Sequence, residues 1–213
     1  MSLGGSLNRL ILDLVFPRRC LGCGRHGMWI CKACSANIQC APAERDLTGT
    51  PVISLLAFEE KMVRESLHAL KYNGLRDVAG ELAQVVLAEA APILEGAVLV
   101  PVPISPSRRK TRGYNQAEEL ARALGENLGL PVWSTALKRL GRSSSQVGKG
   151  AGERQAVEKG FAWEGRGESA YAGRPWVLID DLVTTGATLA ACLDILRPHA
   201  TAGLRAFALA SKS

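Results

Sequence analysis

The segment WVLIDDLVTTGATL at residues 176–189 constrains the fold of this chain more than any other. Residues 176–179 are apolar without interruption, which is typical of a parallel strand buried on both faces. Asp180 and Asp181 come where this strand is expected to end, a short polar loop follows, and residues 189–196 have helical spacing. The segment therefore predicts a consecutive strand, loop and helix of an α/β protein.

The loop after the two acids has a composition suited to phosphate. It consists of Thr184, Thr185, Gly186, Ala187 and Thr188. Backbone N–H groups at the start of a helix attract anions, glycine permits a close approach, and threonine hydroxyls add donors. The two carboxylates can accept hydrogen bonds from a diol, so the segment predicts a site for a ligand with a phosphate and ribose hydroxyls.

Two other interpretations of this segment are possible. A strand that ends in acids also suits the magnesium site of a P-loop nucleotide hydrolase, but the chain lacks the matching Walker loop because Gly150, rather than Ser or Thr, follows Lys149. An ordinary strand and turn is the simpler alternative. A double acid beside a Thr/Gly loop is unusual in a turn, so the phosphate interpretation is favoured.

Residues 176–188 resemble, without a gap, the signature of the type I phosphoribosyltransferases, which use phosphoribosyl pyrophosphate. The resemblance implies a parallel sheet flanked by helices, and Mg²⁺ bound with the phosphoribosyl pyrophosphate. In that family the acid pair holds the ribose 2′- and 3′-hydroxyls, a role that falls here on Asp180 and Asp181 as the expected catalytic residues. The loop of residues 184–188 would hold the 5′-phosphate.

A cluster of cysteines near the N-terminus predicts a metal site. Cys20, Cys23, Cys31 and Cys34 form two CxxC pairs, and four thiolates make a closed tetrahedral zinc site. A disulfide framework is the alternative, but residues 1–20 do not resemble a secretion signal, so we expect structural zinc and a cytoplasmic protein. His26 and Cys40 are conceivable substitute ligands, although four cysteines already complete the site.

The composition divides the chain into two expected domains. Apolar residues at helical spacing within 7–15 predict a short helix that Pro17 ends, and the cysteine cluster follows it. Residues 43–50 are polar and mark the expected domain boundary. We therefore expect a helix and zinc knuckle at residues 1–45 and a phosphoribosyltransferase-like α/β domain at residues 46–213.

Strands and helices alternate in the second domain, which favours a parallel sheet. The pattern predicts strands at 52–58, 97–102 and 161–163, and a strand and turn within 131–140. Helices are predicted at 60–70 and 76–89. The last strand, 203–210, alternates enough to be expected at an edge of the sheet.

A basic segment follows the strand at 97–102. Arg108, Arg109, Lys110 and Arg112 precede Asn115, the expected cap of a helix. Runs of charge are usually solvated, but this run lies between a strand and a helix, at the edge of the sheet where ligands bind. Phosphate or pyrophosphate binding is therefore favoured over a nucleic-acid patch.

Four motifs in a fixed order resemble the ComF family over nearly the whole chain: FPRRC with the cysteine knuckle, LKYNG, PVP…RGYNQ and the phosphoribosyl signature. The resemblance implies a cytoplasmic role in natural competence, in the uptake of single-stranded DNA, beside a DNA translocase of the helicase type. The motif positions expected near the pyrophosphate are Lys71, Tyr72, Arg112, Asn115 and Gln116, together with Gln146 and Arg154 of the loop 141–154. That loop is either a lid over the substrate or a disordered surface segment.

Overall composition leaves two hypotheses open. A net charge of +6 suits polyphosphates or nucleic acid, and no apolar run is long enough to span a membrane. The first hypothesis is an enzyme that transfers the ribosyl group from phosphoribosyl pyrophosphate to an unidentified nucleophile. The second is a non-catalytic adaptor that holds single-stranded DNA, although aromatic residues for stacking make up only 5% of the chain.

Overall fold

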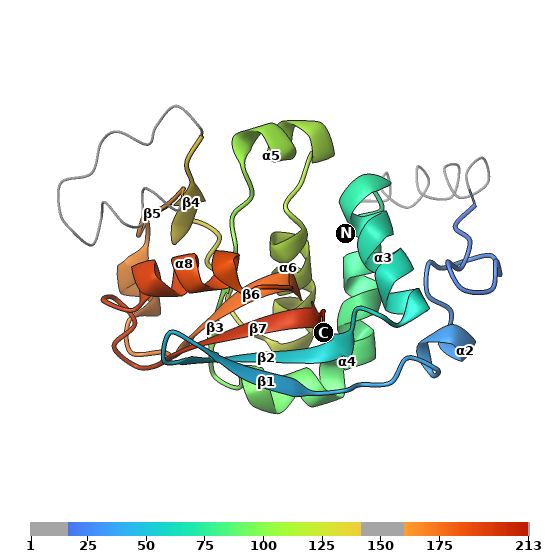
Figure 1. The fold of residues 1–213 in the computed structure, drawn as a ribbon, viewed down its shortest axis with the longest axis horizontal. Helices are drawn as coiled ribbons and strands as arrows, with labels where there is room; N and C mark the ends of the chain where they lie inside the picture. Colours follow the sequence, from blue (N-terminus) through green and yellow to red (C-terminus); the bar gives the residue numbers. More distant parts are fainter. Residues whose placement is uncertain (1–16, 142–159, 213) are drawn as a thin grey trace.

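The computed structural model describes residues 17–141 and 160–212. Its centre is a five-stranded sheet in the order β1-β2-β7-β6-β3 (Figure 1). The strands are β1 (Ala43–Leu47), β2 (Thr50–Ala57), β7 (Leu204–Ser211), β6 (Trp176–Val183) and β3 (Val98–Pro101). All neighbours are parallel except the β1–β2 hairpin. The expected parallel α/β sheet is therefore confirmed.

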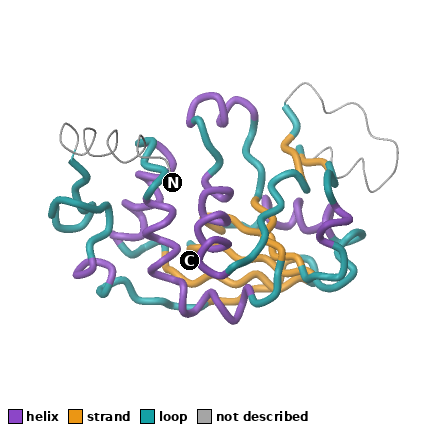
Figure 2. Tube along the Cα trace, turned by 180° about the vertical axis from the view of Figure 1, so that it is seen from behind, coloured by secondary structure: helices purple, strands orange, loops and turns teal. Residues whose placement is uncertain are grey.

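Helices cover both faces of this sheet (Figure 2). One face carries α3 (Lys61–Tyr72), α4 (Val78–Leu94) and α6 (Gln116–Leu128), and the other carries α8 (Ala187–Leu196). Successive residues of a strand point to opposite faces. Accordingly, Val177 and Ile179 of β6 join the core under α3, α4 and α6, while Trp176 and Leu178 join the core under α8.

Two expectations about the sheet are wrong. The final strand, β7, does not lie at an edge but pairs with β2 on one side and β6 on the other. Its alternation of Ala with Phe and Leu imitates an amphipathic strand, yet Ala is small and apolar, and residues 206–210 are all buried. Strand β6 also continues through Asp180 and Asp181 to Val183. The two acids therefore lie inside the strand, near its carboxyl end.

The polar segment 43–50, expected to mark the domain boundary, forms a hairpin with the start of β2. Strand β1 pairs antiparallel with β2, and the boundary expected at residue 45 falls inside it. Thr48 and Gly49 form the turn with φ of 57° and 77°, the left-handed conformation that two-residue hairpin turns require. Along β1 only Arg45 and Leu47 are half-buried. The strand is polar because one side of it faces water.

The remaining elements are short. They are α2 (Lys32–Ser35), α5 (Pro106–Arg112), the 3₁₀ helix η1 (Glu168–Tyr171), and a two-stranded sheet of β4 (Leu137–Arg139) and β5 (Phe161–Trp163). The strand at 161–163 is confirmed, and the strand expected within 131–140 is reduced to β4. The expected helix within 7–15 and the loop residues Gln146 and Arg154 lie outside the described residues. None of the described helices combines the length and apolarity that crossing a membrane requires.

Candidate functional site

The four cysteines of the two CxxC pairs come together as expected. Their sulfur atoms all lie within 4.8 Å of one another, so the four residues are arranged to hold one metal ion. Neither His26 nor Cys40 belongs to this group. Thiolate sulfur is the preferred donor for zinc and other soft metals, and the donor set therefore fits the expected metal.

This cysteine group is packed against the α/β domain. Glu81 of α4 accepts hydrogen bonds from the backbone N–H of Trp29, at 3.2 Å, and of Ile30. Cys20 and Ile30 are buried in the same core cluster as the residues of α3 and α4. Gly22 allows this packing, because a Cβ there would lie 3.1 Å from the sulfur of Met62 in α3. The knuckle thus shares its core with the larger domain.

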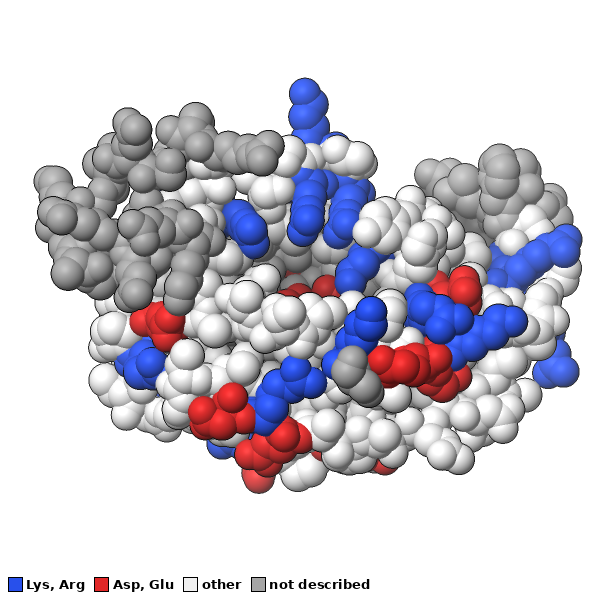
Figure 3. All heavy atoms as spheres, in the orientation of Figure 1, with Lys and Arg blue, Asp and Glu red and all other residues white. Residues whose placement is uncertain are grey.

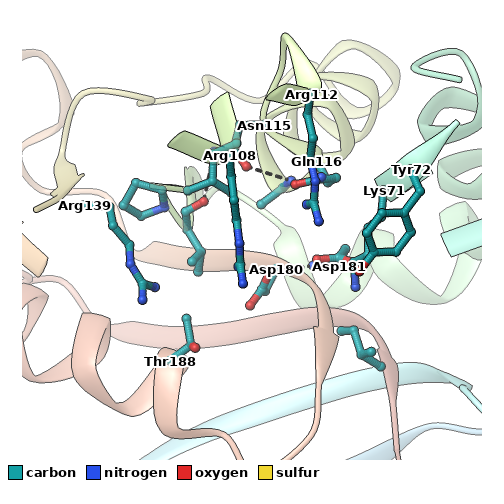
Figure 4. Close-up of a pocket in the computed structure, with 15 residues that line it drawn as sticks. Lys71, Tyr72, Arg108, Arg112, Asn115, Gln116, Arg139, Asp180, Asp181 and Thr188 are labelled. Atoms are coloured by element: carbon teal, nitrogen blue, oxygen red, sulfur yellow. Dashed lines mark hydrogen bonds and ion pairs between the residues drawn. The ribbon is translucent and has the colours of Figure 1, made fainter. Parts of the chain in front are cut away.

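A cavity of about 280 Å³ opens where β6 and β3 end. In an open α/β sheet this is the edge at which ligands bind. Figure 3 shows Lys and Arg side chains around a hollow with acidic side chains at its floor. The polar and aromatic residues that line it are Lys71, Tyr72, Arg108, Arg112, Asn115, Gln116, Arg139, Asp180, Asp181 and Thr188 (Figure 4).

Asp180 and Asp181 lie at the centre of this cavity but differ in their surroundings. Asp181 is only 7% exposed, and its Oδ2 lies 2.5 Å from the Lys71 ammonium at the end of α3. Asp180 is half-buried, and its Oδ1 accepts a hydrogen bond from the Asp181 backbone N–H at 2.9 Å. Burial, and then the neighbouring Asp181 charge, raise the pKa of Asp180 well above its ordinary value.

The basic segment forms a short helix, α5, over the cavity, which its sequence pattern does not predict. Ser105 caps α5 by accepting a hydrogen bond from Arg108 N at 3.3 Å, and Gly113 ends it in the left-handed conformation. Arg108 and Arg112 are one helical turn apart, so they share a face, and both line the cavity. Arg109 instead pairs with Glu118 at 3.2 Å.

Figure 4 shows cations on both sides of the acid pair. Arg139 lies on the side of Thr188, Arg108 points toward Asp180, and Arg112 lies on the side of Lys71 and Asp181. Arg139 comes from β4, and nothing in its local sequence marks it as a site residue. Its guanidinium lies 4.2 Å from the Phe161 ring centroid, a contact that positions it beside the cavity.

Asn115 and Gln116 have different roles at the start of α6. The Asn115 side chain caps the helix by accepting from Ala117 N at 3.2 Å, as expected, and donates to the Val102 carbonyl at 2.9 Å. Gln116 is 2% exposed, and its Nε2 has no hydrogen-bond partner among the described residues. Buried donors are normally paired, so this amide on the cavity wall is suited to a ligand oxygen.

The segment 184–188, which the sequence predicts to hold phosphate, is only partly in the cavity. Thr188 lines it, whereas Thr184, Thr185, Gly186 and Ala187 are not among its lining residues. The β1–β2 hairpin braces this loop, because Arg45 Nη1 donates to the Thr184 carbonyl at 2.9 Å. Leu47 packs on Gly186, where a Cβ would lie 2.6 Å from its Cδ1. Gly186 also has a φ of 78°. Both the close approach of Leu47 and the left-handed backbone conformation therefore require a glycine at this position.

The curated proteins similar to this chain are named as competence or DNA utilization proteins. No protein-family model matches the chain. It is 30% identical over 148 residues to "Competence protein F" of Haemophilus influenzae, covering 70% of this chain and 61% of the relative. It is 33% identical to "Competence protein ComFC" of Bacillus subtilis, covering 60% and 50%, and 28% identical to "DNA utilization protein YhgH" of Salmonella typhi, covering 75% and 67%.

Similar solved structures are phosphoribosyltransferases. One is an alanine mutant made to analyse an invariant aspartic acid in HPRTs, with a TM-score of 0.39, 17% identity and coverage of 64% of this chain and 68% of that one. Another is hypoxanthine phosphoribosyltransferase from Trypanosoma cruzi in a ternary substrates complex, with a TM-score of 0.37, 17% identity and coverage of 65% and 68%.

The class of protein is therefore an α/β protein with a mostly parallel sheet and an N-terminal four-cysteine group arranged for metal. Within this class, the competence protein F, ComFC and YhgH relatives confirm the resemblance to the ComF family that the four sequence motifs predict. The chain spans 61% of the Haemophilus influenzae protein and half of the Bacillus subtilis protein.

Proposed function

We propose that the cavity binds phosphoribosyl pyrophosphate with Mg²⁺, and that the protein acts in the uptake or use of DNA, as the names of its relatives say of them. The observation that supports this most directly is the order of charges in the cavity. Asp180 and Asp181 lie in the middle, with Arg139 on the Thr188 side and Lys71 and Arg112 on the other. The groups of phosphoribosyl pyrophosphate follow a matching order, because its ribose diol lies between two anionic groups, the 5′-phosphate and the pyrophosphate.

Each part of the ligand then has a chemically suitable partner. The ribose hydroxyls donate to the Asp180 and Asp181 carboxylates, and the 5′-phosphate accepts from Thr188 and Arg139. The pyrophosphate lies toward Arg112 and the unpaired Gln116 amide. Mg²⁺ fits the oxygen donors of the acid pair, and when bound it spreads the negative charge of the pyrophosphate.

The reaction proposed here is a displacement at the anomeric carbon of the ribose. The bond to pyrophosphate breaks, its electron pair leaves with pyrophosphate, and a nucleophile forms a bond to that carbon through an oxocarbenium-like state. The protein contributes position, through the acid pair, and neutralisation of the leaving charge, through Arg112 and Lys71. No general base is assigned, because none of the described residues of the cavity stands out for that role.

Calorimetry tests the ligand site. The double variant Asp180→Asn/Asp181→Asn should lose phosphoribosyl pyrophosphate binding in the presence of Mg²⁺, because the amide side chains cannot accept from the diol as carboxylates do. Asp77→Asn is a matched control, since Asp77 is an exposed acid just before α4 and does not line the cavity. Equal affinity in the double variant and the wild type would refute the site.

A non-catalytic adaptor that binds single-stranded DNA is the second candidate. The Arg and Lys side chains around the hollow in Figure 3 favour it, because such a surface also attracts a phosphodiester backbone. Pyrophosphate release measured with a panel of acceptors separates the two. Turnover supports the enzyme, whereas tight single-strand binding without turnover supports the adaptor. A cytoplasmic location and a helicase-type translocase as partner belong to either proposal.

We also propose that the metal of the four-cysteine group is zinc and that it is structural. Four thiolates leave no open position for a substrate, and the group packs against α3 and α4 rather than facing the cavity. Elemental analysis of the purified protein should find one equivalent of zinc. Removal of Cys23, the exposed member of the four, should abolish stoichiometric zinc binding.

A further inference from the structure

Helix α5 lies apart from the core of the protein. Figure 1 shows it beyond the edge of the sheet where the cavity opens, joined to β3 and α6 by two extended segments. None of its residues is buried, so apolar packing does not fix its position. A hydrogen bond from Asn115 to the Val102 carbonyl, at 2.9 Å, joins the two segments at their base. The direction in which Arg108 and Arg112 point therefore depends on polar contacts.

Two charged side chains of α5 reach the neighbouring helices. Arg109 Nη1 lies 3.2 Å from Glu118 Oε2 of α6. The Arg112 guanidinium lies 5.1 Å from the ring centroid of Tyr72 at the end of α3. Tyr72 is 65% exposed, and cation–π contacts at exposed sites are weak. The ion pair with the buried Glu118 therefore constrains α5 more strongly than the contact with the ring.

Glu118 is a buried carboxylate with both of its oxygens paired. Its side chain is 8% exposed, and Oε1 lies 2.6 Å from Nη2 of Arg122, one turn further along α6. Buried charges are costly unless they are paired, so each arginine offsets part of this cost. Arg122 also fixes the direction of the carboxylate, because both residues belong to the same helix. Oε2 is thereby directed at α5, where it meets Arg109.

The same two helices carry the donors proposed for the pyrophosphate. Arg112 comes from α5 and the unpaired Gln116 amide comes from α6, and both line the cavity. Glu118 lies in the same first turn of α6 as Gln116. Its ion pair with Arg109 therefore sets how far Arg112 lies from Gln116. Donors contribute most when they are held in place before the ligand arrives, so this spacing matters for binding.

We propose that Glu118 is a positioning residue, which through Arg109 holds α5 so that Arg112 and Gln116 meet the pyrophosphate together. This inference rests on the proposed function and adds residues outside the cavity, since neither Glu118 nor Arg109 lines it. The negative charge of Glu118 by itself opposes the binding of an anion. Neutralising Glu118 would therefore strengthen binding if only its charge mattered, whereas the positioning role requires that binding weaken.

The test compares two ligands that differ by the pyrophosphate group. Dissociation constants of phosphoribosyl pyrophosphate and of ribose 5-phosphate are measured by calorimetry with Mg²⁺ in the wild type and in variants. Glu118→Gln should weaken phosphoribosyl pyrophosphate binding about tenfold, the order of one lost hydrogen bond to a charged group, and leave ribose 5-phosphate binding unchanged. Arg109→Ala should have the same effect, and Arg109→Lys, which keeps the charge, should preserve most of the affinity.

Arg122→Ala is the matched control. It removes a second arginine from the same carboxylate, with a side chain 54% exposed against 58% for Arg109, but it does not touch α5, so both affinities should stay as in the wild type. Arg109 is exposed, so its variants decide the matter if Glu118→Gln does not fold.

Three outcomes overturn the positioning role and leave the ligand site intact. They are unchanged or tighter phosphoribosyl pyrophosphate binding in Glu118→Gln, equal losses in Arg109→Ala and Arg122→Ala, and a loss that ribose 5-phosphate shares equally. Failure of the wild type to bind phosphoribosyl pyrophosphate overturns the proposed function and the positioning role together.

Discussion

The cysteine group and the cavity both gather polar side chains, but burial has opposite consequences in the two regions. At the cysteine group, Cys20 and Cys31 are buried with a complete set of thiolate donors around them. In the cavity, burial raises the pKa of Asp180, and the Gln116 amide has no partner among the described residues. In the proposed function, the metal of the first region stabilises the fold, whereas the second region holds groups at a cost that ligand binding would relieve.

The largest effect is expected from disrupting the cysteine group. Cys31→Ser removes a buried ligand of a group that shares its core with α3 and α4. Structural zinc contributes on the order of 10 kcal/mol in small fingers, so we expect the free energy of unfolding to fall by roughly 3 kcal/mol or more. Thermal unfolding with and without a chelator measures this. Cys40→Ser, outside the group, is the control. Equal melting temperatures for the two variants would show that the four-cysteine group does not stabilise the fold.

The next largest effect concerns the ion pair in the cavity. Lys71→Ala leaves Asp181, 7% exposed, with an unpaired buried charge, and this should lower the free energy of unfolding by about 3 kcal/mol. Lys71→Ala/Asp181→Asn removes both charges and should recover most of the loss. A double-mutant cycle by urea denaturation measures the coupling between the two residues. Additive effects would show that Asp181 does not depend on Lys71.

The sequence predicts the cysteine group better than the cavity, for a physical reason. All four ligands lie within residues 20–34, so spacing alone brings them together. The cavity collects residues from α3, α5, α6, α8, β4 and β6. Its acids are recognisable because a run of buried apolar residues precedes them in the sequence. Arg139 is not, because its place beside the cavity depends on how β4 packs.

Two elements, and the position of a third, escape the sequence patterns for related reasons. Helix α5 is a polar segment of seven residues and has no apolar periodicity. Strand β1 is an edge strand with polar residues on its exposed side. Strand β7 is buried on both faces, but Ala at alternate positions imitates one polar face. In each case the missing information is which surface the neighbouring elements cover.

A substitution of Gly186 tests whether the β1–β2 hairpin supports the segment 184–188. Gly186→Ala adds strain from a φ of 78° and a Cβ that would lie 2.6 Å from Leu47 Cδ1, and we expect a loss of about 2 kcal/mol. Gly49→Ala is a matched control, because its φ is 77° but nothing lies within 4 Å of the added Cβ. The difference between the two variants in urea denaturation isolates the Leu47 contact. Equal losses would mean that the hairpin can move away from the loop.

The smallest effect on stability, and the one opposite in sign, is expected at Asp180. Its pKa in the folded protein is raised by burial and by Asp181, so the protonated form favours folding. That contribution is present below the ordinary carboxyl pKa of about 3.9 and is lost as the pH rises through the raised value. Above the raised pKa the ionised group therefore destabilises the fold, and Asp180→Asn should there raise the melting temperature by about 3 °C.

The pH profile distinguishes this mechanism from a general effect of the amide. Because Asn does not titrate, the advantage of Asp180→Asn over the wild type should grow as the pH rises through the raised pKa and disappear in acid. Scanning calorimetry at a series of pH values measures both melting temperatures. The same variant should bind phosphoribosyl pyrophosphate less tightly, since the charge that opposes folding is the one proposed to accept from the ribose. A variant that lost stability at neutral pH would place Asp180 with the cysteine group, among the residues arranged to hold the fold together.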